Sequence, residues 1–279
     1  MSSQLAGVLH QGLVDPAAPL LRPDDLGVVR GDAVFESIRW HDGRLDALDA
    51  HLRRLCDSAA TLGLPEPDLP AWRRLIEQMC AAWTGGEAAL RLYLTRGTDE
   101  PTCFALMAPI AESVLRQRRE GARVLTLSRG MPADAFAGRP WLLGGAKTTS
   151  YAINMAAIRY AESQGADDAI FVSTDGTVLE APTATVVWAE ADTLWTPPEE
   201  LGILRSTTLG TLFEAAPRYG FTTAVRRSTV DDLHAADGVW LVSSMRCAVA
   251  VTEIDGKARA DGGLSGRVQA AAGLQTSGS

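Results

Sequence analysis

The stretch Gly144-Gly145-Ala146-Lys147-Thr148-Thr149-Ser150-Tyr151 contains one of only two lysines in a chain of 279 residues. The other lysine, Lys257, lies in Ile254-Asp255-Gly256-Lys257 and is expected in an exposed turn. Lys147 instead follows an apolar run and precedes a predicted helix over residues 149–164. In that position an amine can be buried and used as a nucleophile. An ordinary lysine at a helix start is the alternative.

Composition and charge are those of an ordinary soluble globular protein. Hydrophobic residues make up 46% of the chain, charged residues make up 22%, and the net charge is −8. The arginines are scattered, so no nucleic-acid-binding surface is indicated. No apolar run approaches the ~18–20 residues that cross a bilayer, and the first residues lack the pattern of a signal peptide. We therefore expect a cytoplasmic protein that binds neither nucleic acid nor membrane.

The cysteines and histidines form no metal-binding pattern. The four cysteines are widely spaced without a C-x-x-C pair, and the four histidines are isolated from one another. We expect free thiols in a reducing compartment and no metal site.

Apolar periodicity predicts an α+β fold in two domains, with mostly antiparallel sheets and flanking helices. In the first part of the chain it predicts helices over residues 48–62 and 71–83, and strands over residues 33–40, 88–95 and 103–108. Residues 110–120 are charged and lack a clear apolar face, so we place the connection between domains there. The smaller N-terminal domain then covers residues 1–118 and the larger C-terminal domain covers residues 119–279.

The second half of the chain contains short apolar runs that are separated by tight turns. These runs cover residues 169–173, 177–180 and 185–189. They favour antiparallel pairing over a doubly wound parallel sheet. Further elements are predicted over residues 205–219 (helix), 223–226 (strand), 230–235 (helix) and 238–243 (strand). The tail from Gly262 is rich in Gly, Ser and Ala, and we expect its last residues to be disordered.

A lysine that binds pyridoxal phosphate as a Schiff base needs a carboxylate for the pyridine nitrogen and donors for the phosphate. Glu180 is charged within an otherwise apolar or small run, although an exposed strand glutamate is the alternative. Gly202-Ile203-Leu204 before a predicted helix offers backbone amides to an anion. Arg54 and Ser244 are candidate phosphate donors, although surface arginines and turn-capping serines are common.

Taken in order, these pieces resemble the fold-type IV pyridoxal-phosphate enzymes. That family includes branched-chain aminotransferases, D-amino-acid aminotransferases and aminodeoxychorismate lyases. The resemblance covers residues 24–256 and rests on Arg30-Gly31-Asp32-Ala33-Val34-Phe35-Glu36, residues 51–59, 147–151, 176–180 and 202–205, and Ser243-Ser244 before residues 254–256. Ordered matches at such spacing are far more specific than any one of them.

The resemblance implies a role for each matched residue. Lys147 would bind the cofactor covalently and move the proton, and Glu180 would pair with the pyridine nitrogen. Tyr151 lies one residue nearer the lysine than the matching tyrosine of branched-chain enzymes, and its expected contact is the ring hydroxyl. The phosphate ligands implied are Arg54, Ile203, Leu204 and Ser244. Members of the family are usually homodimers, which we expect here as well.

The motifs of the substrate pocket separate the possible reactions. D-amino-acid aminotransferases carry Arg-x-His after the Arg-Gly-Thr turn, where this chain has Asp99-Glu100-Pro101-Thr102-Cys103. Branched-chain enzymes carry Tyr-x-Arg on the preceding strand, where this chain has Ala89-Leu90-Arg91. The stretches over residues 147–155 and 240–245 are most similar to actinobacterial aminodeoxychorismate lyases.

The resemblance therefore favours a lyase of folate biosynthesis that eliminates pyruvate from 4-amino-4-deoxychorismate to give 4-aminobenzoate. We expect Arg30 and Arg246 to bind the two carboxylates of this substrate. An aminotransferase acting on a branched-chain or D-amino acid is the alternative. A non-catalytic relative with a cofactor-binding or structural role is a further alternative.

Overall fold

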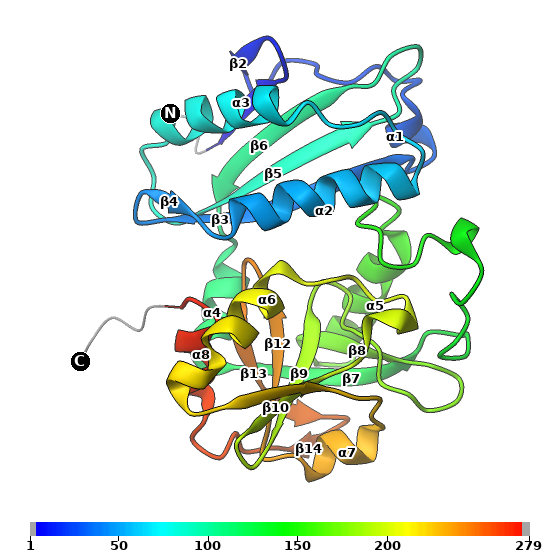
Figure 1. Cartoon of the computed structure of the whole chain (residues 1–279), viewed down its shortest axis with the longest axis vertical. Helices are drawn as coiled ribbons and strands as arrows, with labels where there is room; N and C mark the ends of the chain where they lie inside the picture. Colours follow the sequence, from blue (N-terminus) through cyan, green and yellow to red (C-terminus); the bar gives the residue numbers. More distant parts are fainter. Residues whose placement is uncertain (1–3, 275–279) are drawn as a thin grey trace. The chain divides into compact units, whose positions relative to one another are not determined.

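The chain folds into two units, each built on its own β-sheet (Figure 1). The structure is a computed structural model and describes residues 4–274. The first unit runs to Ala111 and also contains Ala146–Tyr151, and the second contains Glu112–Gly145 and the residues from Ala152 onward. The chain thus divides before α4 (Glu112–Glu120), whereas the sequence placed the division at residue 118, inside this helix.

The sheet of the first unit is antiparallel throughout, with strand order β2-β1-β6-β5-β3-β4. Its strands are β1 (Leu5–Val8), β2 (Gly12–Val14), β3 (Ala33–His41), β4 (Arg44–Leu45), β5 (Ala88–Thr95) and β6 (Cys103–Pro109). A short helix, α1 (Leu26–Val29), precedes β3. Predicted and observed bounds of the long strands agree within one residue, because their apolar runs are uninterrupted.

Two helices, α2 (Leu48–Thr61) and α3 (Leu69–Ala82), lie along one face of this sheet (Figure 1). Their apolar residues recur every three or four positions, so that one side of each helix joins the core. Leu52 and Leu55 of α2 and Trp72 of α3 are almost completely buried in it. The Asp68 side chain accepts a hydrogen bond from the Ala71 amide, which fixes the start of α3.

The sheet of the second unit is mixed, with order β11-β10-β9-β12-β13-β7-β8 and with β14 paired to β13. Its strands are β7 (Ala122–Ser128), β8 (Asp168–Val172), β9 (Thr185–Glu190), β10 (Thr193–Thr196), β11 (Thr222–Val225), β12 (Gly238–Ser243), β13 (Cys247–Ile254) and β14 (Lys257–Ala258). The pairs β10–β11, β13–β7 and β7–β8 are parallel, and the other four are antiparallel. The predicted α+β class with mostly antiparallel sheets is confirmed.

The central strands of this sheet are buried on both faces. Val186 and Trp188 of β9 belong to one core, and Val187 and Ala189 belong to another. The first core includes Leu233 of α7 (Val230–Ala235). The second core includes residues of α6 (Thr207–Ala215), the 3₁₀ helix η3 (Ala216–Tyr219) and α8 (Ser265–Ala271). This double burial explains the continuous apolar runs of β9 and β12.

The predicted elements differ from the observed ones at several points. Residues 177–180 form an isolated bridge and no strand, while α4, β13 and α8 were not predicted. The predicted helix over residues 205–219 is α6 followed by η3, because Pro217 has no amide hydrogen to continue the α-helix. The disorder expected at the end of the chain concerns residues outside those described.

The largest difference between the predicted and the observed elements lies in the segment around Lys147. The helix expected from Thr149 begins three residues later, as α5 (Ala152–Ser163). Residues 147–149 are extended and pair with the start of β3: the Phe35 amide donates to the Lys147 carbonyl at 3.0 Å, and the Thr149 amide donates to the Ala33 carbonyl at 2.8 Å. Backbone pairing with β3 therefore prevails over the helix-starting tendency of Thr148, Thr149 and Ser150.

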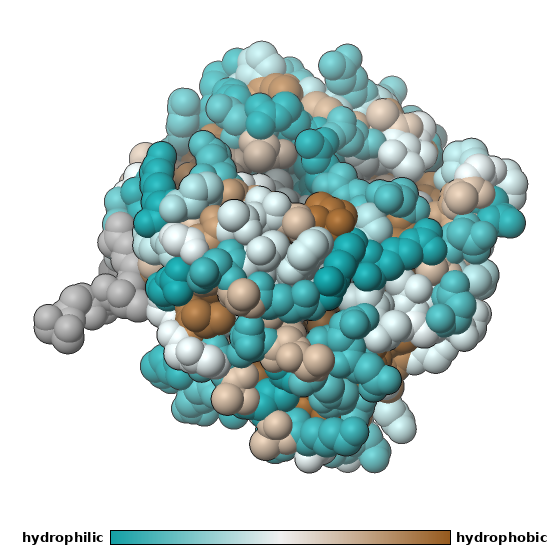
Figure 2. All heavy atoms as spheres, turned by 60° about the horizontal axis from the view of Figure 1, so that its bottom comes forward, coloured by the Kyte–Doolittle hydropathy of each residue, from teal (hydrophilic) through white to brown (hydrophobic). Residues whose placement is uncertain are grey.

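Helix α5 buries a narrow face. Ala157 and Ala161 are its buried residues, and Met155 is exposed. Figure 2 shows a mostly hydrophilic face on which apolar residues form separate spots. Two further 3₁₀ turns, η1 (Pro140–Leu142) and η2 (Glu199–Leu201), lie in loops of the second unit. Among the residues described, no helix is long and apolar enough to cross a membrane.

Two glycines in the first unit test how tightly its turns are built. Gly97 lies between β5 and β6 with φ of 70°, and a Cβ atom there would be 1.8 Å from the Glu100 carbonyl oxygen. Gly43 lies between β3 and β4 with φ of 77°, and a Cβ atom there would meet nothing within 4 Å. We predict that Gly43→Ala costs about 1–2 kcal/mol of unfolding free energy, the strain of a left-handed alanine. We expect Gly97→Ala to lower the unfolding free energy by clearly more, because its Cβ atom would also collide with the Glu100 carbonyl oxygen. Denaturant unfolding measures both losses. Equal losses would contradict the described turn.

Candidate active site

Lys147 is held by the first unit through both of its backbone polar groups. Its amide donates to Ser58 Oγ of α2 at 3.0 Å, and its carbonyl accepts from the Phe35 amide of β3. The side chain is half-buried, and Nζ lies 4.4 Å from the centre of the Phe35 ring and 5.8 Å from that of the Tyr151 ring. The two rings pack edge to face. The backbone of Lys147 is thus bonded to α2 and β3, and its amine lies beside two aromatic rings.

Helix α2 presents three buried polar residues, His51, Arg54 and Ser58. Between the first two lies Glu36 of β3, which is 0% exposed. Its Oε1 accepts from Arg54 Nε at 2.7 Å, and its Oε2 accepts from Arg54 Nη2 at 2.7 Å and from His51 Nδ1 at 2.6 Å. These four side chains and Lys147 occupy one region of the unit.

The charge state of this cluster follows from its contacts. Burial alone would raise the pKa of Glu36, but the hydrogen bonds and charges of Arg54 and His51 lower this pKa to about 2. Burial lowers the pKa of His51, the charges of Arg54 and Lys147 lower it further, and Glu36 opposes them. At neutral pH Glu36 is therefore ionised and His51 is neutral, with its Nδ1 hydrogen directed to the carboxylate.

Sequence reasoning named Arg54 but missed Glu36, His51 and Ser58 as site residues. A signal for Glu36 was present: Val34, Glu36 and Ile38 alternate along β3, and all three are 0% exposed. A charged residue at an inward position of a strand requires a partner. The expectation that Arg54 holds a phosphate stays a prediction, with two of its guanidinium N–H groups already directed to Glu36.

The second unit contains the other residues named from the sequence. Glu180 is half-buried, and its Oε2 accepts a hydrogen bond from the Leu204 amide at 3.0 Å. Gly202, with φ of 75°, turns the chain just before this amide. The Leu204 amide therefore donates to the Glu180 carboxylate here, and its expected role toward a phosphate stays a prediction. Ile203 is buried, and the roles of Glu180 and Ile203 toward a cofactor stay predictions.

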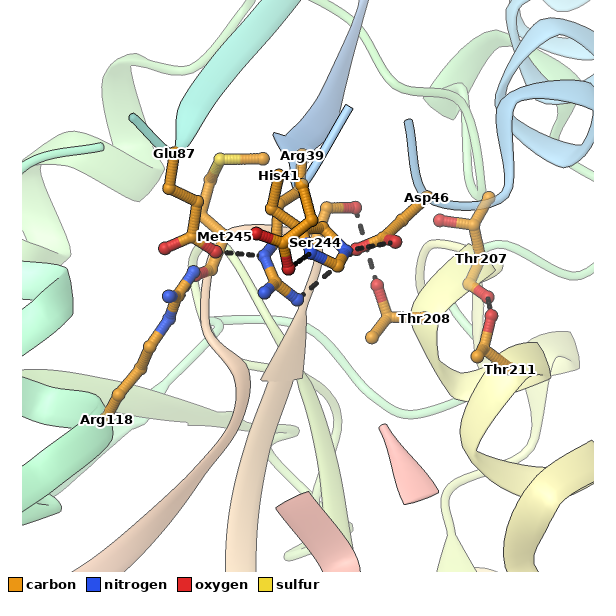
Figure 3. A network of polar contacts seen from close by, with 11 residues as sticks. Arg39, His41, Asp46, Glu87, Arg118, Thr207, Thr208, Thr211, Ser244 and Met245 are labelled. Carbon is orange, nitrogen blue, oxygen red and sulfur yellow. Dashed lines mark hydrogen bonds and ion pairs between the residues drawn. The ribbon is translucent and has the colours of Figure 1, made fainter. Parts of the chain in front are cut away.

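Ser244 lies beside the first turn of α6. Its Oγ is 3.4 Å from Thr208 Oγ1 (Figure 3). The helix begins at Thr207, and the Ser206 side chain caps it by accepting from the Leu209 amide. The helix therefore begins at Thr207, whereas the sequence predicted its start at residue 205, directly after Leu204. Thr208 was missed, although the run Ser206-Thr207-Thr208 is typical of a helix N-terminus.

The structure places Arg246, the expected substrate ligand, in an internal ion pair, and its role toward a substrate stays a prediction. This arginine is 8% exposed and donates to Gln117 Oε1 at 3.2 Å, to Thr183 Oγ1 at 2.9 Å and to Asp168 Oδ2 at 2.5 Å. Arg118 Nε donates to the Met245 carbonyl at 2.9 Å. Arg246 is thus an internal ion-pair residue, which with Arg118 fixes the turn that carries Ser244. Arg30 is exposed at the end of α1, and its role as a carboxylate ligand stays a prediction.

The internal role of Arg246 leads to a prediction. Asp168→Asn leaves a buried guanidinium without its counter-charge, so we expect a loss of about 3–5 kcal/mol in unfolding free energy. The matched control is Asp24→Asn, which breaks an exposed pair with Arg22 and should cost much less. Denaturant unfolding monitored by circular dichroism measures both. Equal effects would contradict the buried ion pair of Arg246 with Asp168.

Comparison with known proteins gives a consistent result. The model of the amino-transferase class IV family matches residues 33–254. The "bifunctional aminodeoxychorismate lyase / D-amino acid transaminase" of Mycobacterium tuberculosis is 47% identical over 258 residues, which are 88% of this chain and 89% of that protein. A solved "hypothetical aminotransferase" of M. tuberculosis in a PLP-bound form has a TM-score of 0.93 and 44% identity, covering 96% of this chain and 97% of that one.

A fold IV transaminase of Curtobacterium pusillum has a TM-score of 0.89 and 38% identity, covering 97% of each chain. The family match extends over most of the chain and includes β3, the Lys147 segment and the turn at Ser244. The chain therefore belongs to the class IV aminotransferase family, as its ordered sequence motifs predict.

Proposed function

We propose that this protein is a pyridoxal-phosphate-dependent 4-amino-4-deoxychorismate lyase that releases pyruvate and 4-aminobenzoate. The observation that carries the proposal is the 47% identity, over 88% of the chain, with a protein whose name includes this activity. The pocket motifs agree, because residues 99–103 lack the Arg-x-His of D-amino-acid aminotransferases and residues 89–91 lack the Tyr-x-Arg of branched-chain enzymes. 4-Aminobenzoate would make the enzyme part of folate biosynthesis.

The residues of the first unit fit this cofactor. A lysine amine lies over an aromatic ring, and a buried arginine with a fixed guanidinium plane is available in the same unit for a phosphate. Pyridoxal phosphate, when bound, supplies an aldehyde that condenses with amines and a ring that withdraws electrons. The PLP-bound relative from M. tuberculosis supports the same assignment. Glu180 and Ser244 are the ligands that we propose from the second unit.

Lys147 is the group of this chain that we propose to move the proton. Its amide and carbonyl are both hydrogen-bonded, so that Nζ can be displaced only through side-chain rotation. The rings of Phe35 and Tyr151 exclude water from the sides of the amine that they cover. In the proposed reaction Nζ takes the ring proton next to the substrate nitrogen. Loss of the enolpyruvyl group as pyruvate then makes the product aromatic, which drives the step.

A D-amino-acid transaminase activity is the second candidate. The M. tuberculosis relative is named for both activities, so one chain of this family carries the two names together. The shared requirements are the cofactor and a lysine that moves a proton, and both activities can use Lys147. The second reaction differs in needing a 2-oxo acid as co-substrate.

The test is an incubation of the purified protein with enzymatically generated aminodeoxychorismate, without any 2-oxo acid. We predict that pyruvate and 4-aminobenzoate appear in equal amounts, and that Lys147→Arg, which keeps the charge but removes the amine, abolishes both. A separate incubation with D-alanine and 2-oxoglutarate measures transamination. Transamination without 4-aminobenzoate formation would replace the proposal by the second candidate, and the absence of both would overturn it.

A further inference from the structure

A buried carboxylate of the first unit contacts the predicted phosphate ligand and has no role in the reaction described above. Glu36 is 0% exposed and accepts two hydrogen bonds from Arg54, one from His51 and a longer one, at 3.3 Å, from the Ser37 amide. Its two bonds to Arg54 use the Nε–Nη2 edge and are nearly equal in length, which is the bidentate geometry that fixes a guanidinium plane.

The neighbours of Glu36 connect it to Lys147. Phe35, the preceding residue of β3, bonds to the Lys147 backbone and lies under its amine. Ser58, four residues after Arg54 on α2, accepts from the Lys147 amide. Strand β3 and helix α2 therefore both contact Lys147, and Glu36 of β3 bonds to Arg54 of α2. Glu36 joins the two elements across their interface.

A buried ion pair of this kind is a poor source of stability. Removing a carboxylate and a guanidinium from water costs several kcal/mol per ion, and apolar residues of similar volume often serve as well. What the pair does provide is a defined orientation, because a bidentate contact restricts a flexible arginine to one rotamer. His51 adds a further side-chain donor to Oε2, which helps to fix the Glu36 side chain itself.

We propose that Glu36, supported by His51, is a positioning residue that orients Arg54 for the phosphate of the cofactor. This inference rests on the proposed function, since it assumes that pyridoxal phosphate binds next to Lys147. A competing effect has the opposite sign: Glu36 neutralises part of the Arg54 charge and would thereby weaken phosphate binding. A purely structural role would affect folding alone. Orientation of Arg54, charge competition and a structural role predict different changes in one measurable ratio of affinities.

The ratio compares the affinities of the cofactor-stripped full-length protein for pyridoxal 5′-phosphate and for pyridoxal, which lacks the phosphate. Both are measured by absorbance titration. In Glu36→Gln we expect this ratio to fall about tenfold, the scale of one charge-assisted hydrogen bond. The reason is that the amide cannot hold the guanidinium by two charged contacts. A ratio that rises would overturn the proposal in favour of charge competition, and an unchanged ratio would overturn it in favour of a structural role.

Further variants keep the test decisive. Glu36→Asp retains the charge but is one methylene shorter, so we expect a smaller fall, and it takes the place of Glu36→Gln should that variant not fold. In an Arg54→Lys background, Glu36→Gln should change the ratio no further, because a lysine offers no plane to orient. A fall of the same size in that background would contradict an action through Arg54.

The matched control is Asp46→Asn in the same unit. Asp46 bonds to the buried Arg39 and His41, and Figure 3 shows Arg39 between Asp46 and Glu87. We expect this variant to lower the unfolding temperature while leaving the affinity ratio unchanged. A wild-type protein that binds pyridoxal phosphate no better than pyridoxal would overturn the inference and point against the proposed function. A wild-type preference for the phosphate that persists in Glu36→Gln would overturn the inference alone.

Discussion

The backbone pairing between residues 147–149 and the start of β3 determines where the one half-buried lysine of this chain lies. It replaces the expected helix start by an extended segment, and it assigns Ala146–Tyr151 to the first unit while the flanking chain belongs to the second. The amine is consequently positioned by Phe35, Ser58 and Tyr151, which are residues of that unit. Every role discussed for Lys147 depends on these few hydrogen bonds.

Elements with strong local signals could be predicted from the sequence. Helix α2 was predicted within one residue, because its apolar spacing and the turn after it act locally. The extended conformation of the Lys147 segment could not be predicted in this way. Its residues Thr148, Thr149 and Ser150 favour a helix start, and their other partner, β3, is distant in the sequence. Strand β13 was missed as well, although most of its residues are apolar, because a tight turn with left-handed Cys247 separates it from β12.

Two arginines illustrate why site residues are harder to predict than elements. Arg54 and Arg246 were both named as ligands of small anions, and each is paired with a buried carboxylate. The partner of Arg246 is 78 residues away in the sequence, and no local pattern connects the two. The partner of Arg54 could have been found, because Glu36 occupies an inward position in an alternating strand. The order of the motifs identified the family, whereas the partners of both arginines were found only from their contacts.

The central claim is that Lys147 is the lysine that binds the cofactor, and the composition of the chain allows a direct measurement. The chain contains two lysines, of which Lys257 is exposed in the β13–β14 turn region. Borohydride reduction in the presence of pyridoxal phosphate, followed by peptide mass mapping, reports which of them is labelled. The account predicts stoichiometric label on Lys147 and little on Lys257. Equal labelling of the two lysines, or label confined to Lys257, would contradict it.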